Sequence, residues 1–198
     1  MNAAQPVELE NELRTKRLRL TPLQLEHVDL LWPDITDQGI SKHMAWEAHT
    51  DRAQTLQFVQ GEIERRAAGK GITWAIFMDG SFCGIFSIIG VLRTHRALTF
   101  NKAELAYWLG RKYQGRGIMT EAGKRVLDFA FHDLKLHKLF VSHFSVNDAS
   151  GNLIKRLGFR YVGEQLEEFQ KQGVWYNHKL YELLDREYEA QVARASRP

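Results

Sequence analysis

Hydrophobic and polar residues alternate along the chain with two periods, which predict strands and helices in turn. The clearest helical pattern begins at Ile118, after which apolar residues recur at four-residue steps as far as Leu134. Asp79-Gly80 separates two apolar, β-rich runs, which is a strong signal for a hairpin turn. The full series of expected elements is a strand at 17–21, helices at 23–32 and 51–67, strands at 73–78, 81–92 and 104–109, a helix at 118–134, a strand at 138–146, a helix at 149–157, and strands at 160–168 and 175–184.

This order of elements predicts an α/β fold of the α+β kind. The strand at 104–109, the helix at 118–134 and the strand at 138–146 form a strand–helix–strand unit, which implies parallel pairing of its two strands. Pro33 is expected to end the first helix, and 93–102 is expected to be a polar connection. Because hairpins imply antiparallel pairing elsewhere, we expect a mixed, mostly antiparallel central sheet with helices on both faces.

The composition of the chain supports one domain. It has 198 residues, of which 44% are hydrophobic and 26% are charged, as in an ordinary globular protein. It contains no internal repeat, linker or low-complexity block. We therefore expect a single domain over residues 1–198, with a core at about 13–184 and flexible ends at 1–11 and 186–198.

Charge and cysteine content narrow the class of partner. The net charge of +3 demands no nucleic acid but allows a small anionic ligand. The single cysteine, Cys83, excludes an internal disulfide and a cysteine-based zinc cluster, and it fits the reducing cytoplasm. Residues 1–11 do not match a secretory signal, and the apolar run at 82–92 is too short to cross a membrane. The eight histidines lack the spacing of a metal site, so no metal is expected.

The loop before the longest helix is a candidate anion site. Gly115 and Gly117 let the backbone turn tightly, and the first N–H groups of the next helix point at whatever lies in the turn. Three nearby cations add positive charge: Arg111, Lys112 and Arg116. Taken alone, such a glycine pair is most often a plain tight turn. The dinucleotide fingerprint does not fit, because its third glycine would fall at Thr120, and the Gly-Lys-Ser/Thr sequence of nucleotide-triphosphate loops is absent.

Four segments resemble one known family in the right order. Residues 107–122, Tyr-Trp-Leu-Gly-Arg-Lys-Tyr-Gln-Gly-Arg-Gly-Ile-Met-Thr-Glu-Ala, resemble the acetyl-CoA motif of the GNAT N-acetyltransferases. More narrowly, they resemble the RimJ/RimL branch, the ribosomal-protein N-terminal acetyltransferases and their relatives. Residues 13–22 resemble the family's opening strand, 147–150 its Asn-x-Ala-Ser element, and 157–163 its Leu-Gly-Phe…Gly ending. The likeness extends from about residue 13 to 184, which makes it far more specific than a glycine pair.

The resemblance implies the GNAT fold, with acetyl-CoA as cofactor. The strand before the glycine loop and the strand after the helix should splay apart, with pantetheine in the gap against the backbone of Trp108, Leu109 and Gly110. The residues implied to hold the pyrophosphate are Lys112, Tyr113, Gln114, Gly115, Arg116, Gly117, Ile118, Met119 and Thr120. Lys112 departs from the Gln or Arg of the family signature but keeps its cationic character.

For catalysis the resemblance implies a serine as proton donor. Many GNAT enzymes protonate the leaving thiolate with a tyrosine, but this chain has Ile154 at that position. In the RimJ/RimL branch the serine of Asn-x-Ala-Ser takes this role, which assigns it to Ser150. Asn147 would then hold the cofactor, and Asp148 would cap the helix. Without the resemblance, Asn147 and Ser150 would be interpreted as helix caps, since Asn and Ser are common at helix starts.

The general base and the acceptor pocket are marked less sharply. The family's base carboxylate lies near the strand at 160–168, which favours Glu168, and Glu104 is the second candidate. Each could instead be a solvated carboxylate at the end of a strand. Trp46 lies in a region that borders the acceptor pocket of this fold, although plain packing of the loop would also explain it.

The implied function is transfer of an acetyl group from acetyl-CoA to a primary amine, by direct attack in a ternary complex. The favoured acceptor is a protein N-terminal α-amine, of a ribosomal or another protein. The alternatives are a small-molecule acceptor, such as a polyamine, an antibiotic or an amino acid, and a non-catalytic acyl-CoA-binding module. We expect no nucleic-acid or membrane partner, a cytoplasmic location, and a monomer or homodimer.

Overall fold

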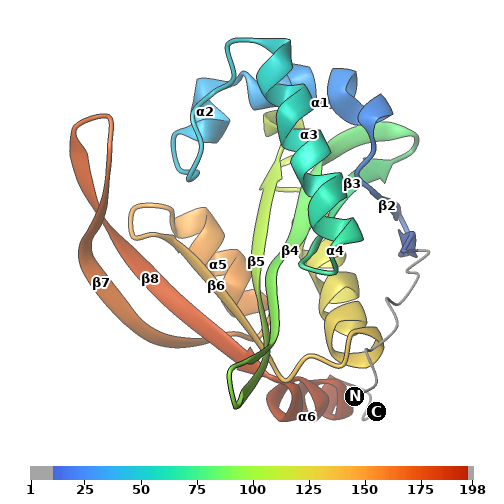
Figure 1. Ribbon diagram of the computed structural model, residues 1–198, viewed down its shortest axis with the longest axis vertical. Helices are drawn as coiled ribbons and strands as arrows, with labels where there is room; N and C mark the ends of the chain where they lie inside the picture. The colour runs from blue at the N-terminus through green and yellow to red at the C-terminus, as the bar shows by residue number, and fades with distance from the viewer. Residues whose placement is uncertain (1–10, 196–198) are drawn as a thin grey trace.

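Eight strands form one mixed sheet in the computed structural model, which describes residues 11–195 (Figure 1). The strands are β1 (Leu13–Arg14), β2 (Leu18–Pro22), β3 (Ile72–Met78), β4 (Ser81–His95), β5 (Leu98–Leu109), β6 (Lys138–Phe144), β7 (Arg160–Lys171) and β8 (Val174–Leu184). Their order across the sheet is β1-β2-β3-β4-β5-β6-β8-β7. Within these residues each neighbouring pair is antiparallel except β5 and β6, which are parallel, so the predicted mixed sheet is confirmed.

Helices cover both faces of this sheet, as expected. They are η1 (Leu25–His27), α1 (Val28–Ile35), α2 (Gln38–Ser41), α3 (Arg52–Ala67), η2 (Arg111–Tyr113), α4 (Ile118–Asp128), the π-helical turn η3 (Phe129–Asp133), α5 (Asp148–Arg156) and α6 (Asp185–Ala195). Residues of α1 and α3, such as Leu31 and Val59, share a buried cluster with Trp108 on one face. Residues of α4 and α5, such as Ile118 and Ile154, belong to the larger cluster on the other face.

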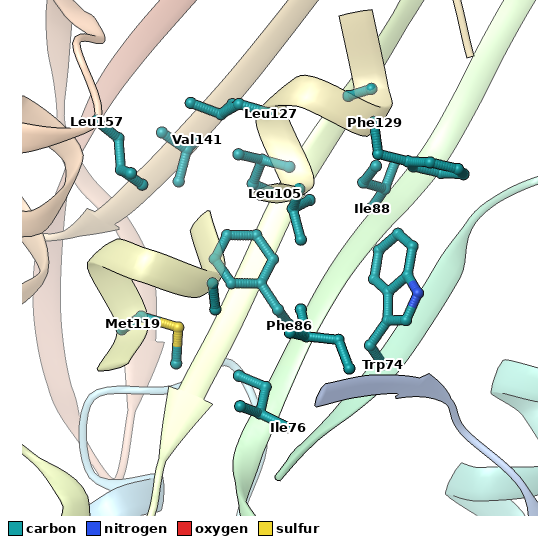
Figure 2. Close-up of a cluster of buried hydrophobic side chains, with 14 of the residues drawn as sticks. Trp74, Ile76, Phe86, Ile88, Leu105, Met119, Leu127, Phe129, Val141 and Leu157 are labelled. Atoms are coloured by element: carbon teal, nitrogen blue, oxygen red, sulfur yellow. The ribbon is translucent and has the colours of Figure 1, made fainter. Parts of the chain in front are cut away.

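The larger core fixes α4 against the sheet (Figure 2). Phe86 of β4 and Leu105 of β5 lie in this cluster with Leu127 of α4, and all three are less than 4% exposed. Trp74 packs edge-on against Phe129, with ring centroids 5.5 Å apart. Burying a side chain of this size contributes about 1.5–3 kcal/mol. The loop that joins β5 to α4 is therefore held at both ends by packed elements.

Strands β5 and β6 separate after a short stretch of pairing. They pair only from Lys102–Glu104 with Lys138–Phe140. Beyond that point β5 continues to Leu109 and β6 to Phe144, and Figure 1 shows the two ribbons diverging. The side of β5 that faces β6 therefore keeps backbone hydrogen-bonding groups for another partner. The predicted splay of the two strands is confirmed.

A helix cap follows from the local sequence, and the predicted hairpin turn is confirmed. Asp51 caps α3, since its side chain accepts a hydrogen bond from the backbone N–H of Ala53 at 2.9 Å. Asp79 and Gly80 join β3 to β4 with φ values of +50° and +77°. Positive φ at both central positions matches the two-residue hairpin that an Asp-Gly pair predicts.

Two predicted boundaries are wrong. Pro33 lies inside α1 instead of ending it, because the buried Leu31 and Ile35 on either side hold the turn despite one missing N–H donor. The polar connection expected at 93–102 is the tip of the β4–β5 hairpin, which turns at Arg96 with φ of +53°. This ribbon is largely exposed, so it carries no alternation of polar and apolar residues that sequence analysis could detect.

The end expected to be flexible at 186–198 is helical over most of its length. Helix α6 runs along the end of the sheet, where Tyr188 stacks on Phe131 with ring centroids 4.9 Å apart. The side-chain amide of Gln191 donates a hydrogen bond to the carbonyl of Gly158 at 3.0 Å. No residue of α6 is buried, so its apolar pattern is too weak to predict a helix. The expected flexibility of 1–10 and 196–198 lies outside the described residues.

Candidate active site

A cleft of about 1070 Å³ opens at the splayed end of β5. Four segments line it: the end of β5, the loop and first turns of α4, the start of α5, and the region around α2. The predicted cofactor residues that line it are Trp108, Leu109, Tyr113, Gln114, Gly115, Arg116, Gly117, Ile118, Met119, Thr120, Asn147 and Ser150. The predicted site residues that do not line it are Gly110, Lys112, Glu104, Glu168 and Trp46.

The start of α4 presents free backbone N–H groups to the cleft. Gly115 and Gly117 have φ values of +73° and +74°, a left-handed conformation that favours glycine. Gly117 occupies the N-cap position and has no side chain to cap the helix. The amides of Ile118, Met119 and Thr120 are therefore available to an anion, and the helix dipole adds to the attraction.

Only one of the three predicted cations lines the cleft, and two others that were not predicted add positive charge. Arg116 lines the cleft, but the Arg111 guanidinium points away and donates to the Asp37 carboxylate at 2.8 Å. The Lys112 ammonium lies over the Tyr113 ring, 4.9 Å from its centroid. The cations that sequence reasoning missed are Lys124 and Arg156, both of which line the cleft. The sequence gives no signal for Arg156. For Lys124 the only signal is its position about two helical turns after Gly117.

The end of β5 is held on its other side by local hydrogen bonds. The Gly110 amide donates to the Cys83 carbonyl at 2.8 Å, and the Gln114 side chain donates to the Leu109 carbonyl at 3.1 Å. A Cβ at position 110 would lie 2.7 Å from a carboxylate oxygen of Asp34, so any other residue there would require the Asp34 side chain to move. Burial raises the pKa of Asp34. Gly110 therefore shapes the strand end without lining the cleft.

Ser150 forms a hydroxyl pair with Tyr107. Their oxygens are 2.9 Å apart, and Ser150 lies in the first turn of α5. Burial raises the pKa of Tyr107 to about 12, although the hydrogen bond with Ser150 opposes this shift. Tyr107 thus keeps its proton near neutral pH and can supply it to Ser150. The motif contained Tyr107, but its spacing gave no sign of this role.

Asn147 is the N-cap of α5. Its side-chain oxygen accepts a hydrogen bond from the Ser150 amide at 3.1 Å. The expectation that Asp148 would be the cap is therefore wrong: Asp148 is the first residue of the helix, and Asn147 precedes it. Because Asn147 also lines the cleft, the cap fixes the start of α5 where Ser150 is presented.

Glu104 lies at the point where β5 and β6 separate. It forms the last rung of their pairing, opposite Phe140, and is half-buried. Burial raises the pKa of its carboxyl, while a hydrogen bond with Ser142 lowers it. Alternation along β5 places Glu104 on the same face as Trp108, which is the face covered by α1 and α3. The carboxyl is therefore held where the two strands separate, on the face of the sheet that α1 and α3 cover.

Glu168 lies on an irregular, exposed part of β7. The pairing with β8 shifts between Gln165 and Phe169, and Glu167 between them has φ of +48°. The Glu167 amide donates to the Asn177 side chain at 2.9 Å, which stabilises the bulge. The bulge explains why the alternation of a regular strand cannot assign the direction of Glu168. Burial lowers the pKa of His178, and the charge of the nearby Glu168 carboxylate opposes this shift.

Trp46 packs against the end of β5. Its ring centroid lies 6.3 Å from that of Trp108 and 6.1 Å from that of His49. Nearby residues Ile40, His43 and Met44 line the cleft instead. The tryptophan thus backs the cleft wall, in keeping with the alternative of loop packing.

Other kinds of site were also sought in residues 11–195. No group of three or more His, Cys, Asp and Glu side chains is arranged to hold a metal ion in that range. None of the helices described there has the length and apolar character needed to span a membrane.

Comparison with known proteins identifies the family. Residues 17–160 match the model of the acetyltransferase (GNAT) domain. The chain belongs to the GNAT acetyltransferase family. GNAT acetyltransferases use acetyl-CoA, which agrees with an anion site and a hydroxyl pair in one cleft. The prediction of the family from four ordered motifs is therefore confirmed.

Two curated GNAT relatives differ in the acceptor that their names give. The protein named "Putative ribosomal N-acetyltransferase YdaF" of Bacillus subtilis is 30% identical over 121 residues, which are 61% of this chain and 63% of that protein. The spermidine N(1)-acetyltransferase of Escherichia coli is 26% identical over 166 residues, which are 81% of this chain and 82% of that protein. The chain thus covers less than two thirds of the length of the first of these relatives.

A solved GNAT structure shares the fold. RimL, the ribosomal L7/L12 alpha-N-protein acetyltransferase in complex with coenzyme A, superposes with a TM-score of 0.79. The match covers 86% of this chain and 95% of RimL at 20% sequence identity. At that identity the likeness supports the fold and leaves the acceptor open.

Proposed function

We propose that this chain transfers the acetyl group of acetyl-CoA to the α-amine of a protein N-terminus, by direct attack of the amine in a ternary complex. One observation carries the proposal: a single cleft is lined by both the uncapped start of α4 and the Ser150 side chain. These two features supply what an acyl-CoA thioester requires, a site for the pyrophosphate and a proton donor for the leaving thiolate.

The residues present fit the cofactor. Acetyl-CoA, when bound, supplies an acetyl group activated as a thioester. The amides of Ile118, Met119 and Thr120 would hold its pyrophosphate, and the Arg116 side chain would add positive charge. The unpaired edge of β5 at Trp108 would accept the pantetheine arm as a strand accepts another strand.

Ser150 is the proposed proton donor to the leaving thiolate. As the amine forms its bond to the carbonyl carbon and the carbon–sulfur bond breaks, the Ser150 hydroxyl gives its proton to sulfur. The Tyr107 hydroxyl, 2.9 Å away and protonated near neutral pH, then returns a proton to Ser150. Tyr107 lines the cleft and would regain its own proton from solvent there. A positioned acid of this kind contributes about 10²–10⁴-fold to the rate.

Glu104 is the proposed base, in place of the first choice from sequence, Glu168. The raised pKa of the half-buried Glu104 carboxyl suits removal of a proton from an amine near neutral pH. Glu168 is exposed to solvent on the bulge of β7, where water can compete with an amine for hydrogen bonds to its carboxylate. Because Glu104 does not line the cleft, it would receive through water the proton that the attacking amine loses.

The charge near α2 favours a peptide over a polyamine as acceptor. His43 lines the cleft, and its pKa is lowered by burial and by the positive charges of Lys42 and Lys171. A polyamine would bring several further positive charges to this wall, whereas a peptide N-terminus brings one amine. An α-amine, with a pKa near 8, also loses its proton more easily than a side-chain amine near 10.4.

We place this activity in the cytoplasm. The one cysteine of the chain, Cys83, is a free and buried thiol, which suits a reducing compartment. Newly made protein N-termini are available there.

A thiol-release assay with three amines tests the proposal. The acceptors are a hexapeptide with a free N-terminal serine, the same hexapeptide with a blocked N-terminus, and spermidine. Saturable release of coenzyme A with the free peptide alone is expected. Faster turnover of spermidine would replace the protein acceptor with a polyamine. Binding of acetyl-CoA without release for any amine would indicate a non-catalytic module.

A further inference from the structure

Lys171, at the end of β7, makes three hydrogen bonds to a part of the chain far away in sequence. Its ammonium nitrogen lies 2.7 Å from the Ser41 carbonyl, 2.8 Å from the Met44 carbonyl and 2.7 Å from the Trp46 carbonyl. An ammonium has three donors, so these three bonds use all of them. The side chain is only 10% exposed, and the Glu47 carboxylate lies 3.7 Å away. A lysine that is buried and fully hydrogen-bonded in this way connects two segments of the chain, whereas a surface lysine extends into water.

The segment that Lys171 holds is also fixed at its other end. We name residues 37–46 the wall segment. Asp37 begins it, and the Asp37 carboxylate accepts hydrogen bonds from the Gly39 amide at 2.7 Å and from the Arg111 guanidinium at 2.8 Å. Arg111 belongs to the loop that precedes α4. The wall segment therefore bridges the cofactor loop and the β7–β8 hairpin, whose far end lies beside α2 in Figure 1.

The wall segment forms one side of the cleft. Gly39, Ile40, His43 and Met44 all line it. The anion site and the Ser150–Tyr107 pair belong to other elements, namely β5, α4 and α5. None of the three carbonyls that Lys171 contacts belongs to those elements. Removing Lys171 should therefore loosen one wall of the cleft and leave the cofactor side intact.

We propose that Lys171 is a positioning residue that holds the wall segment in place for the acceptor, and that it acts on acceptor binding without contacting the reacting atoms. The inference rests on the proposed function, since it assumes that the wall segment faces the incoming amine. Without the ammonium, the part-buried carbonyls of Met44 and Trp46 would lose this donor, while the Ser41 carbonyl would keep the Met44 amide as a donor. The segment would then open to recover hydrogen bonds with water. An acceptor would then have to order the wall again on binding, which weakens its affinity.

Two variants and a matched control test this role. Lys171→Met keeps most of the volume of the side chain and removes the charge and donors. Lys171→Cys followed by aminoethylation restores an ammonium at nearly the original length. The reagent should reach position 171, where the side chain is 10% exposed, before it reaches Cys83, which is 0% exposed. Lys179→Met removes a lysine from the same hairpin that makes none of the three bonds.

The readouts are amide hydrogen exchange of the 42–46 segment, acetyl-CoA affinity by calorimetry, and steady-state kinetics with the free serine hexapeptide. For Lys171→Met we expect faster exchange and an acceptor KM raised about tenfold or more. Acetyl-CoA affinity should stay within about twofold of wild type. Aminoethylation of Lys171→Cys should restore the low KM, and Lys179→Met should resemble wild type.

Three results would overturn the inference: unchanged exchange in Lys171→Met, an unchanged acceptor KM despite faster exchange, or an equal loss of acetyl-CoA affinity. The last would indicate a general structural role. Failure of the proposed function is a separate result, because it would appear in the wild-type protein as binding of acetyl-CoA without turnover of any amine. In that case hydrogen exchange still decides whether Lys171 holds the wall segment.

Discussion

The two sides of the cleft are built in different ways. The cofactor side comes mainly from one continuous run, 107–120, and it acts through backbone N–H groups that glycine conformations expose. The acceptor side joins the wall segment to β7 through Lys171, across more than 120 residues of sequence. It depends on side chains that hold one loop in place. The cofactor side is thus set by local sequence, whereas the proposed acceptor side is set by tertiary contacts.

The largest loss of acetyl-CoA binding is expected when Gly117, the N-cap of α4, is replaced by a residue with a side chain. Gly117→Val places a β-branched residue at a φ of +74°, which strains the loop and crowds the amides that would face the pyrophosphate. We expect loss of acetyl-CoA affinity by at least about 100-fold in isothermal titration.

Gly61→Ala is the matched control for that experiment. Gly61 lies inside α3, and an added Cβ would meet no atom within 4 Å. This variant should bind acetyl-CoA as the wild type does and should be slightly more stable. Equal loss of affinity in both variants would show that the measured effect is not specific to the cap.

A second effect, on turnover instead of cofactor affinity, is expected where the two sides meet. Ser150→Ala removes the proposed proton donor and should lower kcat by about 10²–10⁴-fold. Acetyl-CoA affinity should change little, because the amides of α4 remain. Stopped-flow thiol release and calorimetry on the same protein sample separate these two quantities.

Tyr107→Phe separates the contribution of the Ser150 hydroxyl from that of its hydrogen-bond partner. It removes the partner of the Ser150 hydroxyl, 2.9 Å away, but leaves the donor itself. Its kcat should therefore fall less than that of Ser150→Ala. A normal kcat for Ser150→Ala would remove Ser150 from the mechanism whatever Tyr107→Phe does.

The pH dependence tests which carboxylate belongs to the acceptor side. Burial raises the pKa of Glu104, and a base acts only when ionised, so kcat/KM should fall as the pH drops through this raised pKa. Glu104→Gln should remove this acid limb and lower kcat about 10–100-fold, while Glu168→Gln should keep the limb. Rate profiles over the acid and neutral range would show it. Loss of the limb only in Glu168→Gln would restore the first interpretation of the sequence.

The stability of the Glu104→Gln variant serves as a control for its folding. A carboxyl whose pKa is raised in the folded state stabilises the fold while protonated, and that contribution is lost as the pH rises through the raised pKa. At neutral pH the amide should therefore fold at least as stably as the wild type. A lower unfolding temperature at that pH would mean that the kinetic loss includes a structural defect.

The smallest expected effect concerns the cap of α5. Asn147→Ala removes the acceptor for the Ser150 amide and should cost about 1 kcal/mol of stability. The Asp148 side chain does not accept that hydrogen bond in the wild type, so Asp148→Ala should cost less stability. Chemical denaturation of the two variants compares them directly, and a larger loss for Asp148→Ala would contradict the assignment of the cap.

The backbone geometry of the glycine loop and of the start of α5 could be predicted from the sequence because local rules govern it. A glycine pair before a strongly periodic helix, and Asn-x-Ala-Ser at the start of another, carry their geometry within a few residues. The cations were harder to place: Arg111 was expected at the anion site, but the carboxylate of Asp37, the N-cap of α2, accepts its hydrogen bond instead. A charge near a loop does not specify which way its side chain points.

The acceptor side could not be derived in the same way. Lys171 is one lysine among many, and only the folded chain brings it to Ser41, Met44 and Trp46. The bulge at Glu167 breaks the alternation on which the assignment of Glu168 depended. Helix α6 buries no residue, so its sequence resembles a charged tail. In each case the missing information is tertiary.

The product of the reaction tests the central claim most directly. The wild-type protein would be incubated with acetyl-CoA and a lysine-containing hexapeptide with a free N-terminal serine, and the peptide would be analysed by fragmentation mass spectrometry. The account predicts one acetyl group, on the α-amine, and no product when the N-terminus is blocked. Acetylation of the lysine side chain, or an unmodified peptide alongside acetylated spermidine, would contradict it.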